Sequence, residues 1–207
     1  MRLTKAGEYA IRCVLYRATI GKVKGLNLQI DMICPDHGII WRKDPGRIME
    51  AYERWAKQEP KRRAIIVYDT MWHSTQAMAE VIAEALWSEG VPTVVRKLRA
   101  SHRSDIMTEV LDAGAIIIGS PTLINGLFPT IADMLTYMKG LKPLNKVAAA
   151  FGSYGWSGEA VKLINEQLEA MKFDVVHPGV RVQYVPDEAA KEACRELAIK
   201  VAEALPA

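Results

Sequence analysis

The sequence predicts an α/β protein built on one doubly wound sheet of five parallel strands, preceded by a short N-terminal helical extension. Short runs of apolar, largely β-branched residues alternate with amphipathic helical patterns from Ala64 onward. Consecutive apolar positions are typical of strands covered on both faces, and strands that alternate with helices form parallel sheets through right-handed crossovers. Polar or glycine-rich loops follow the first, third and fourth of these strands. Together these observations favour an open α/β sheet with a binding site at the carboxyl ends of its strands.

The strands are expected at residues 64–69, 93–98, 115–119, 146–151 and 180–185. The first four are followed by helical patterns at residues 75–88, 104–112, 129–140 and 159–171. Ser104 is expected to cap one of these helices, and Pro129 occupies the first position of the next. Pro186-Asp187-Glu188 leads into the last helix, which is expected to end near Leu205.

Residues 1–60 are expected to form an N-terminal extension, and residues 61–207 the α/β domain. Apolar residues at helical spacing predict one helix over residues 1–18 and another over residues 46–57. Residues 57–63 are interpreted as a linker, in which the basic cluster Lys61-Arg62-Arg63 is solvated.

The composition excludes several classes of protein. Half of the 207 residues are hydrophobic, and the net charge of +3 is too small to indicate nucleic-acid binding. The three cysteines, Cys13, Cys34 and Cys194, lie far apart, which favours reduced thiols over a disulfide framework. No apolar run approaches the roughly 20 residues of a membrane span. We therefore expect a soluble, cytoplasmic protein that binds neither nucleic acid nor a membrane.

The loop after the first strand predicts a phosphate site. Thr70, Ser74 and Thr75 supply hydroxyl groups there, and the helix behind them leaves its first N–H groups unpaired. No lysine or arginine lies between Ala64 and Arg96, so neutral donors would hold the anion. The alternative interpretation is an ordinary helix start, with Ser74 or Thr75 as the N-cap.

The loops after the third and fourth strands predict a site for a planar ring. These loops cover residues 120–128 and 152–158. Pro121, Leu123, Tyr154 and Trp156 offer flat or apolar surfaces, and Asn125 and Ser153 offer hydrogen-bonding groups. In an open α/β sheet both loops converge with the first loop at the switch point. A phosphate at one end and a flat heteroaromatic at the other describe a mononucleotide such as FMN.

A metal site within this chain is not expected. The four histidines, His37, His73, His102 and His177, form no cluster with acidic residues at metal-ligand spacing. His37 lies in a tight loop beside a proline and a glycine, where a single structural histidine is the simpler interpretation.

Residues 64–204 resemble the flavodoxin-like domain of flavodiiron proteins, also called A-type flavoproteins. Three motifs carry the resemblance: Tyr68-Asp-Thr-Met-Trp-His-Ser-Thr75, Gly119-Ser-Pro-Thr-Leu-Ile-Asn125 and Phe151-Gly-Ser-Tyr-Gly-Trp-Ser-Gly158. The resemblance implies a flavodoxin-like sheet with strand order 2-1-3-4-5 and FMN as cofactor. The cofactor-binding residues that it implies are Thr70, Met71, Trp72, His73, Ser74, Thr75, Pro121, Thr122, Leu123, Asn125, Ser153, Tyr154, Gly155 and Trp156.

Two N-terminal segments resemble parts of other domains. Residues 25–55 resemble the last piece of the metallo-β-lactamase-like domain of flavodiiron proteins, in which His37 would match the final diiron ligand. The remaining ligands of that domain are absent, so we do not expect reduction of oxygen or nitric oxide. Residues 1–16 resemble the opening of a family of winged-helix repressors, but no recognition helix follows.

The expected function is electron transfer by bound FMN, because no catalytic acid, base or nucleophile stands out. A rubredoxin-like protein or an NADH-linked reductase would be the redox partner, and the apolar surface left without the iron domain is open to self-association. Three alternatives remain: an FMN-dependent reductase of quinones that uses NAD(P)H, a flavin-sensing regulatory module, and a truncated flavodiiron-type protein whose diiron portion comes from another polypeptide.

Overall fold

The computed structural model describes residues 30–206, and these fall into two compact units that divide between Gln58 and Glu59. The helix expected over residues 1–18 and the repressor-like opening lie outside the described residues. The predicted domain boundary between residues 60 and 61 stays a prediction. In the N-terminal unit, helix α2 spans Pro45–Lys57, and Ile33 and Trp41 form a single antiparallel bridge.

Strand β1 spans Lys61–Tyr68, so the interpretation of residues 61–63 as a solvated linker is wrong. The Lys61 ammonium lies 2.7 Å from the Asp112 carboxylate, and the Arg63 guanidinium lies 2.6 Å from that of Glu109. Arg62 donates a hydrogen bond to the carbonyl of Ala202 at 3.1 Å. Ion pairs and hydrogen bonds to the following elements therefore hold these basic residues in the sheet.

The main sheet has the predicted strand order. Its parallel strands run in the order β2-β1-β3-β6-β7. Strand β8 also pairs with β6, further along that strand than β7 does. The strands are β2 (Thr93–Lys97), β3 (Ala113–Gly119), β6 (Val147–Tyr154), β7 (Asp174–Val175) and β8 (Val180–Gln183). One strand was expected, over residues 180–185, where β8 lies; the short strand β7 was not predicted. The intervening residues contain Pro178, which has no N–H to donate to a ladder, and Gly179 at φ +98°.

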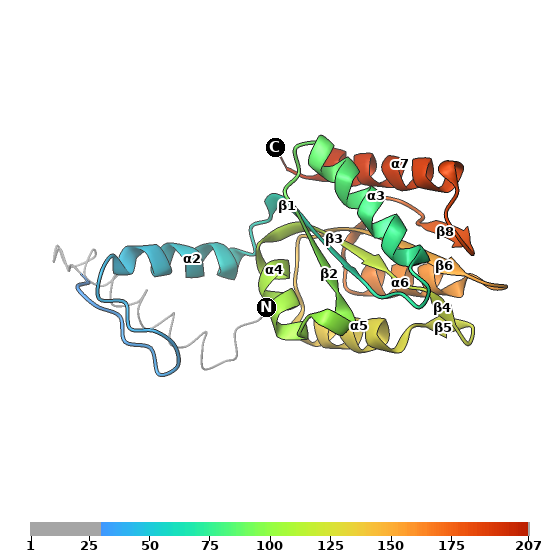
Figure 1. Cartoon of the computed structure of the whole chain (residues 1–207). Helices are drawn as coiled ribbons and strands as arrows, with labels where there is room; N and C mark the ends of the chain where they lie inside the picture. Colours follow the sequence, from blue (N-terminus) through green and yellow to red (C-terminus); the bar gives the residue numbers. More distant parts are fainter. Residues whose placement is uncertain (1–29, 207) are drawn as a thin grey trace. The chain divides into compact units, whose positions relative to one another are not determined.

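Helices cover both faces of this sheet (Figure 1). One face carries α3 (Ser74–Ser88) and α7 (Glu188–Ala204); the other carries α4 (Arg103–Asp112), α5 (Pro129–Leu141) and α6 (Glu159–Ala170). A short 3-10 helix, η1, spans Leu98–Ala100. None of the described helices combines the length and the apolar character that crossing a bilayer requires.

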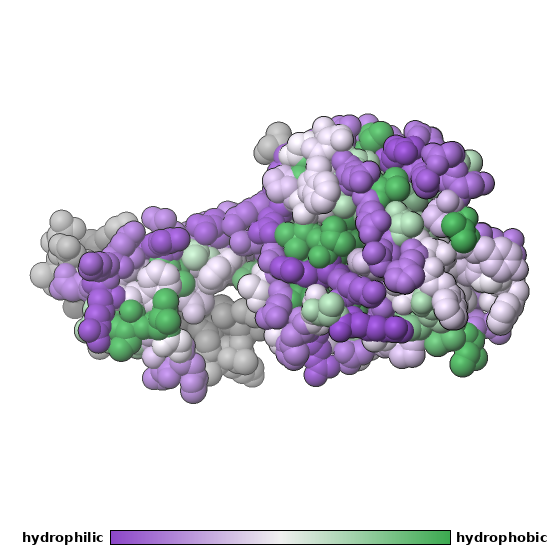
Figure 2. Space-filling view, viewed as in Figure 1, coloured by the Kyte–Doolittle hydropathy of each residue, from purple (hydrophilic) through white to green (hydrophobic). Residues whose placement is uncertain are grey.

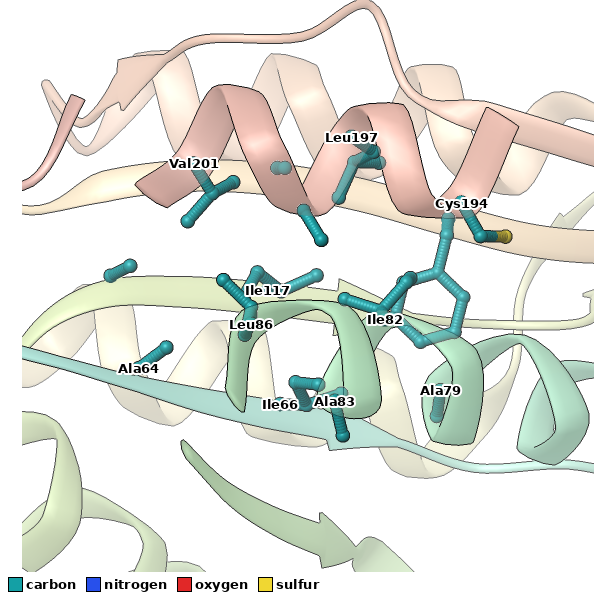
Figure 3. Packing of buried hydrophobic residues seen from close by; sticks show 14 of the residues in the cluster. Ala64, Ile66, Ala79, Ile82, Ala83, Leu86, Ile117, Cys194, Leu197 and Val201 are labelled. Carbon is teal, nitrogen blue, oxygen red and sulfur yellow. The ribbon is translucent and has the colours of Figure 1, made fainter. Parts of the chain in front are cut away.

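Successive strand residues point to opposite faces, and each face has its own core. On the first face Ile66 and Ile117 pack with Ile82 of α3 and Leu197 of α7, as Figure 3 shows. On the second face Ile65 packs in the cluster that α4, α5 and α6 complete. All five of these isoleucine and leucine side chains are buried. Because both faces are covered, a ligand reaches this sheet only at the ends of its strands.

Two helix starts differ from the predictions. The N-cap of α4 is His102, whose Nδ1 accepts a hydrogen bond from the Ser104 N–H at 3.2 Å, so Ser104 is not the cap. The N-cap of α3 is His73, at φ 67°, and its side chain makes no capping hydrogen bond. Ser74 and Thr75 are therefore not N-caps. Asp187 caps α7 through a 2.8 Å bond from the Ala190 N–H.

Candidate functional site: a cleft at the carboxyl ends of the strands

A cleft of about 780 Å³ opens where β1, β3 and β6 end. We call it the carboxyl-end cleft. Its lining comes from the loop after β1, the segment after β3, the end of β6 with the loop that follows, and the two residues after β8. The lining residues are Met71, Trp72, Ser74, Pro121, Thr122, Leu123, Ile124, Asn125, Ser153, Tyr154, Gly155, Trp156, Ser157, Tyr184 and Val185. The three loops that the sequence pattern singled out therefore meet in one place.

The Asp69 side chain anchors the start of the first loop, residues 70–75, through contacts with two other elements. Its carboxylate is buried and accepts bonds from the Thr70 N–H at 2.8 Å and from the Thr130 hydroxyl at 2.7 Å. The Arg99 guanidinium lies 3.3 Å from the same carboxylate and stacks on the Phe128 ring. Sequence reasoning missed this residue, because its partners lie 30 and 61 positions away in the chain. These contacts anchor the start of the first loop to α5 and to η1.

Thr70 leaves a buried polar atom without a partner. Only 3% of the residue is exposed, and its hydroxyl Oγ1 makes no hydrogen bond to the described residues. Thr70 lies four residues before α3, whose N-cap side chain makes no capping hydrogen bond and whose first turn contains no acidic residue. Unpaired donors and the positive end of a helix dipole suit an anion. The residues present thus fit a phosphate group.

Three of the predicted residues do not line the cleft: Thr70, His73 and Thr75. Thr75 is fully buried, and its Oγ1 lies 2.9 Å from Oγ of Ser153, so this hydroxyl pair joins the first loop to β6. The His73 ring turns to Gln76, with 3.2 Å between Nδ1 and Oε1. The hydroxyl of Thr75 is therefore already occupied within the protein, whereas that of Thr70 has no partner among the described residues.

The segment 120–128, expected to be a loop, contains a hairpin of β4 (Thr122–Leu123) and β5 (Gly126–Leu127). Its turn residues Ile124 and Asn125 have φ values of 49° and 54°, the pattern of a type I′ turn. The Ser157 hydroxyl donates to Oδ1 of Asn125 at 3.1 Å. The hairpin is thereby tied to the third loop.

The third loop is shorter than expected, because β6 continues to Tyr154 and includes Ser153. At Gly152 a Cβ atom would overlap the carbonyl oxygen of Ser120, so only glycine allows the two segments to approach this closely. Gln183 donates from Nε2 to the Gly155 carbonyl at 2.7 Å and holds the loop from the side of β8.

Sequence reasoning missed Ile124, Ser157, Tyr184 and Val185 in the cleft. The Tyr184 N–H donates to the Tyr154 carbonyl at 2.8 Å, which brings the residues after β8 alongside the third loop. The signal that would have found them is their position after a parallel strand, the same rule that identified the other loops.

Among residues 30–206, no lysine, arginine, aspartate, glutamate or histidine lines the cleft. Trp72 and Trp156 lie 85% and 87% exposed, and Tyr184 lies 65% exposed. Aromatic rings next to backbone polar groups suit a flat heteroaromatic ligand. The cleft thus combines a helix start suited to an anion with exposed aromatic rings and no charged lining residue among those that the structure describes.

The family model described as Flavodoxin matches residues 66–197, which is more than half of the chain. The chain belongs to the flavodoxin family. Flavodoxin domains bind FMN, and the family serves electron transfer. The predicted fold class and family are therefore confirmed.

Relatives of this flavodoxin-like chain are named as reductases of nitric oxide and of oxygen. It is 46% identical over 184 residues to a nitric oxide reductase of Moorella thermoacetica, covering 88% of this chain and 46% of the relative. It is 44% identical over 185 residues to a rubredoxin-oxygen oxidoreductase of Megalodesulfovibrio gigas, with coverage of 88% and 46%. The chain thus spans about half the length of these relatives and corresponds to their flavodoxin-like part.

Solved structures agree. The rubredoxin oxygen:oxidoreductase of Desulfovibrio gigas superposes with a TM-score of 0.82 at 43% identity, covering 91% of this chain and 47% of that one. The flavodiiron protein of Giardia intestinalis gives 0.83 at 29% identity, covering 93% and 47%. An archaeal flavodoxin gives 0.59 at 32% identity, covering 68% and 96%.

The N-terminal unit of this flavodoxin-like chain presents His37 as an exposed side chain in the bend after Pro35. Within residues 30–206, no group of three or more histidine, cysteine, aspartate or glutamate side chains is arranged to hold a metal ion. Cys34 is exposed and Cys194 is buried, and both are free thiols.

Proposed function

We propose that this chain binds FMN in the carboxyl-end cleft and serves as an electron-transfer module. The observation that carries the proposal is the buried Thr70 hydroxyl, which has no partner among the described residues and belongs to the loop that leads into α3. A buried polar group without a partner is rare in folded proteins, because leaving it unpaired costs free energy. A bound phosphate would supply the missing acceptor.

The phosphate end of the proposed site consists of the loop from Thr70 to Thr75. The hydroxyl groups of Thr70 and Ser74 and the N–H groups of Trp72 and His73 would donate to the phosphate. Thr75 stands behind them, joined to Ser153 at 2.9 Å. Thr75 would position the first turn of α3. Its hydroxyl would contact the phosphate only after turning away from the Ser153 hydroxyl.

The ring end of the proposed site consists of the hairpin and the third loop. Pro121, Thr122, Leu123 and Asn125 would border the isoalloxazine on one side, and Tyr154, Gly155 and Trp156 would cover the other. Asn125 is held by Ser157, and Gly155 by Gln183, so the polar groups at the ring edge are oriented in advance. Such preorganisation lowers the entropy that binding would otherwise lose.

Bound FMN supplies redox chemistry, and the protein supplies orientation, exclusion of water and local electrostatics. Within the described part of the chain, tyrosine is the one titratable residue type that lines the cleft, so the cleft offers no general acid–base group suited to a dedicated substrate reaction near neutral pH. An electron relay needs none. We therefore favour relay over the quinone-reductase alternative.

The redox partner would be a rubredoxin-type protein or an NADH-linked reductase. Relatives named rubredoxin-oxygen oxidoreductase and flavorubredoxin support the first of these. The exposed indole rings of Trp72 and Trp156 at the mouth of the cleft would provide the contact through which electrons enter and leave.

The test is a fluorescence titration of the flavin-free chain with FMN, with riboflavin as the comparison. FMN is expected to bind at least tenfold more tightly than riboflavin, because only FMN engages the loop from Thr70 to Thr75. The loaded chain should then pass electrons between a reductase and a rubredoxin. Absence of FMN binding, or equal affinity for the two flavins, would reject the proposed site.

A further inference from the structure

A buried negative charge lies at the start of residues 70–75, which we call the phosphate loop. The Asp69 side chain is 0% exposed and directly precedes Thr70, whose buried hydroxyl has no partner among the described residues. Oδ1 of Asp69 accepts from the Thr70 N–H at 2.8 Å, so the carboxylate faces this loop. A phosphate bound at Thr70 would therefore lie close to a carboxylate of the same sign. The low dielectric of a buried site strengthens such repulsion.

Arg99 is placed to neutralise this charge. Its Nε lies 3.3 Å from Oδ2 of Asp69, and no other cationic group of residues 30–206 is within ion-pair distance of that carboxylate. The guanidinium carbon also lies 4.9 Å from the centre of the Phe128 ring. A cation is attracted to the face of an aromatic ring, so the ring helps to hold the guanidinium beside the carboxylate. Such a partner is needed, because a buried charge without one is costly.

Arg99 reaches Asp69 from the edge of the sheet. It belongs to η1, the short helix directly after β2, and β2 is the edge strand. Figure 2 shows hydrophilic surface over this edge, viewed as in Figure 1. The Arg99 side chain is 52% exposed, although its carboxylate partner is fully buried. Arg99 does not line the carboxyl-end cleft, so its effect on a ligand there passes through Asp69.

We propose that Arg99 is a positioning residue for the flavin phosphate: by neutralising and holding the buried Asp69 carboxylate, it allows the phosphate loop to accept a dianion. The inference rests on the proposed function, because it concerns the phosphate end of that site. Arg99 thereby sets the preference for FMN over riboflavin without touching either flavin. The uncharged riboflavin does not sense the Asp69 charge in this way.

Fluorescence titrations of the flavin-free chain with FMN and with riboflavin test this proposal. The readout is the FMN preference, defined as the dissociation constant of riboflavin divided by that of FMN. Arg99→Met removes the charge and keeps an unbranched side chain that packs on an aromatic ring. Its FMN preference should fall about tenfold or more, because the uncovered carboxylate repels the phosphate. Arg99→Lys keeps the positive charge and should retain most of the preference.

A double variant separates the charge of Arg99 from its packing. Asp69→Asn combined with Arg99→Met removes both charges, and the asparagine oxygen can still accept from the Thr70 N–H. The Thr130 hydroxyl, which donates to the carboxylate in the natural chain, can instead accept from the asparagine side-chain N–H. The double variant should therefore recover the FMN preference of the natural chain to within about threefold.

Arg103→Met is the matched control. The Arg103 guanidinium lies 3.0 Å from Oδ1 of Asp133 and 4.7 Å from the centre of the Tyr137 ring, so it forms the same kind of ion pair and ring contact. The difference is that the Asp133 side chain is 61% exposed. Neither Arg103 nor Asp133 lines the cleft. The FMN preference of Arg103→Met should therefore equal that of the natural chain.

Riboflavin affinity reports whether each variant is folded, and it should stay unchanged throughout. If Arg99→Met weakens both flavins equally, or keeps the natural FMN preference, the proposal fails. A loss in the double variant or in Arg103→Met as large as in Arg99→Met would also overturn it. These results leave the proposed function standing as long as the natural chain prefers FMN. Equal affinity of the natural chain for the two flavins would instead reject the proposed function and this inference together.

Discussion

Replacing Thr70 with valine should strengthen the flavin-free protein and weaken its hold on FMN. Valine has the shape of threonine but lacks the hydroxyl. In the folded chain this hydroxyl is buried, with 3% of the residue exposed, and makes no hydrogen bond to the described residues. The substitution therefore removes an unsatisfied polar group from the flavin-free protein and a hydrogen-bond donor from the proposed phosphate site. The substitution should therefore raise the stability of the flavin-free protein and lower its affinity for FMN.

The magnitudes follow from the two environments. An unsatisfied buried hydroxyl destabilises a protein by about 1–3 kcal/mol, so Thr70→Val should raise the free energy of unfolding of the flavin-free chain by about 1 kcal/mol or more. A hydrogen bond to a charged group contributes about 1.5–3 kcal/mol, which corresponds to a loss of roughly 10- to 150-fold in affinity for FMN. Riboflavin lacks the phosphate, so its affinity should stay unchanged.

Thr75→Val is the matched control. The Thr75 hydroxyl already has a partner, Oγ of Ser153 at 2.9 Å, and the residue is fully buried. Removing it breaks a bond within the protein and leaves the Ser153 hydroxyl with one partner fewer. The free energy of unfolding should then fall by about 1 kcal/mol. The two threonines of one loop are thus expected to respond in opposite directions in the flavin-free chain.

Urea denaturation of the flavin-free variants gives the first quantity, and fluorescence titration with FMN and riboflavin gives the second. If Thr70→Val binds FMN as tightly as the natural chain does, the hydroxyl does not contact the phosphate. If it lowers the stability of the flavin-free chain as Thr75→Val does, the hydroxyl has a partner in the protein and the reasoning fails.

Three further outcomes are expected. Ile124→Asn should stabilise the chain by about 1 kcal/mol in urea denaturation by relieving the strained turn; no gain would contradict the strain. Gly152→Ala should destabilise the chain by about 1–3 kcal/mol and weaken FMN binding, because the added Cβ would overlap the Ser120 carbonyl oxygen. The control is Gly140→Ala: Gly140 lies within α5 with open space around it, so this change should leave stability unchanged or raise it. Burial lowers the pKa of Lys146 from 10.5 to about 8, so the unfolded chain binds more protons between these values. Stability relative to Lys146→Met should therefore rise with pH from about 8 to about 10, and a flat or falling difference would contradict the shift.

The alternation of strands and helices was predictable from the chain because hydrophobic periodicity is a local property. The apolar run at residues 64–68 and the helical spacing of Met78, Ile82 and Leu86 carry this information within a few residues. The position of the cleft was predictable too, since parallel strands place the loops that follow them at one end of the sheet. The three loops meet as expected.

The predictions from the sequence were wrong or incomplete where contacts between residues far apart in the chain determine the structure. Lys61 and Arg63 looked like a solvated cluster until their carboxylate partners on α4 were known. His73 replaced Ser74 and Thr75 as the N-cap because the chain enters α3 at φ 67°, a conformation set by the loop as a whole. Tyr184 joined the cleft through a backbone bond to Tyr154, 30 residues earlier in the chain.

The amino-acid sequence alone predicted the α/β sheet and the loops that line the cleft, because hydrophobic periodicity and position after a strand are local properties, and the resemblance of three motifs indicated the family. Only the folded chain decided that the Thr70 hydroxyl lacks a partner among the described residues while the Thr75 hydroxyl has one, and that exposed hydrophobic side chains gather around one opening. The physical reason is that hydrogen bonding and burial depend on neighbours in space, and those neighbours come from strands and loops far apart in the chain.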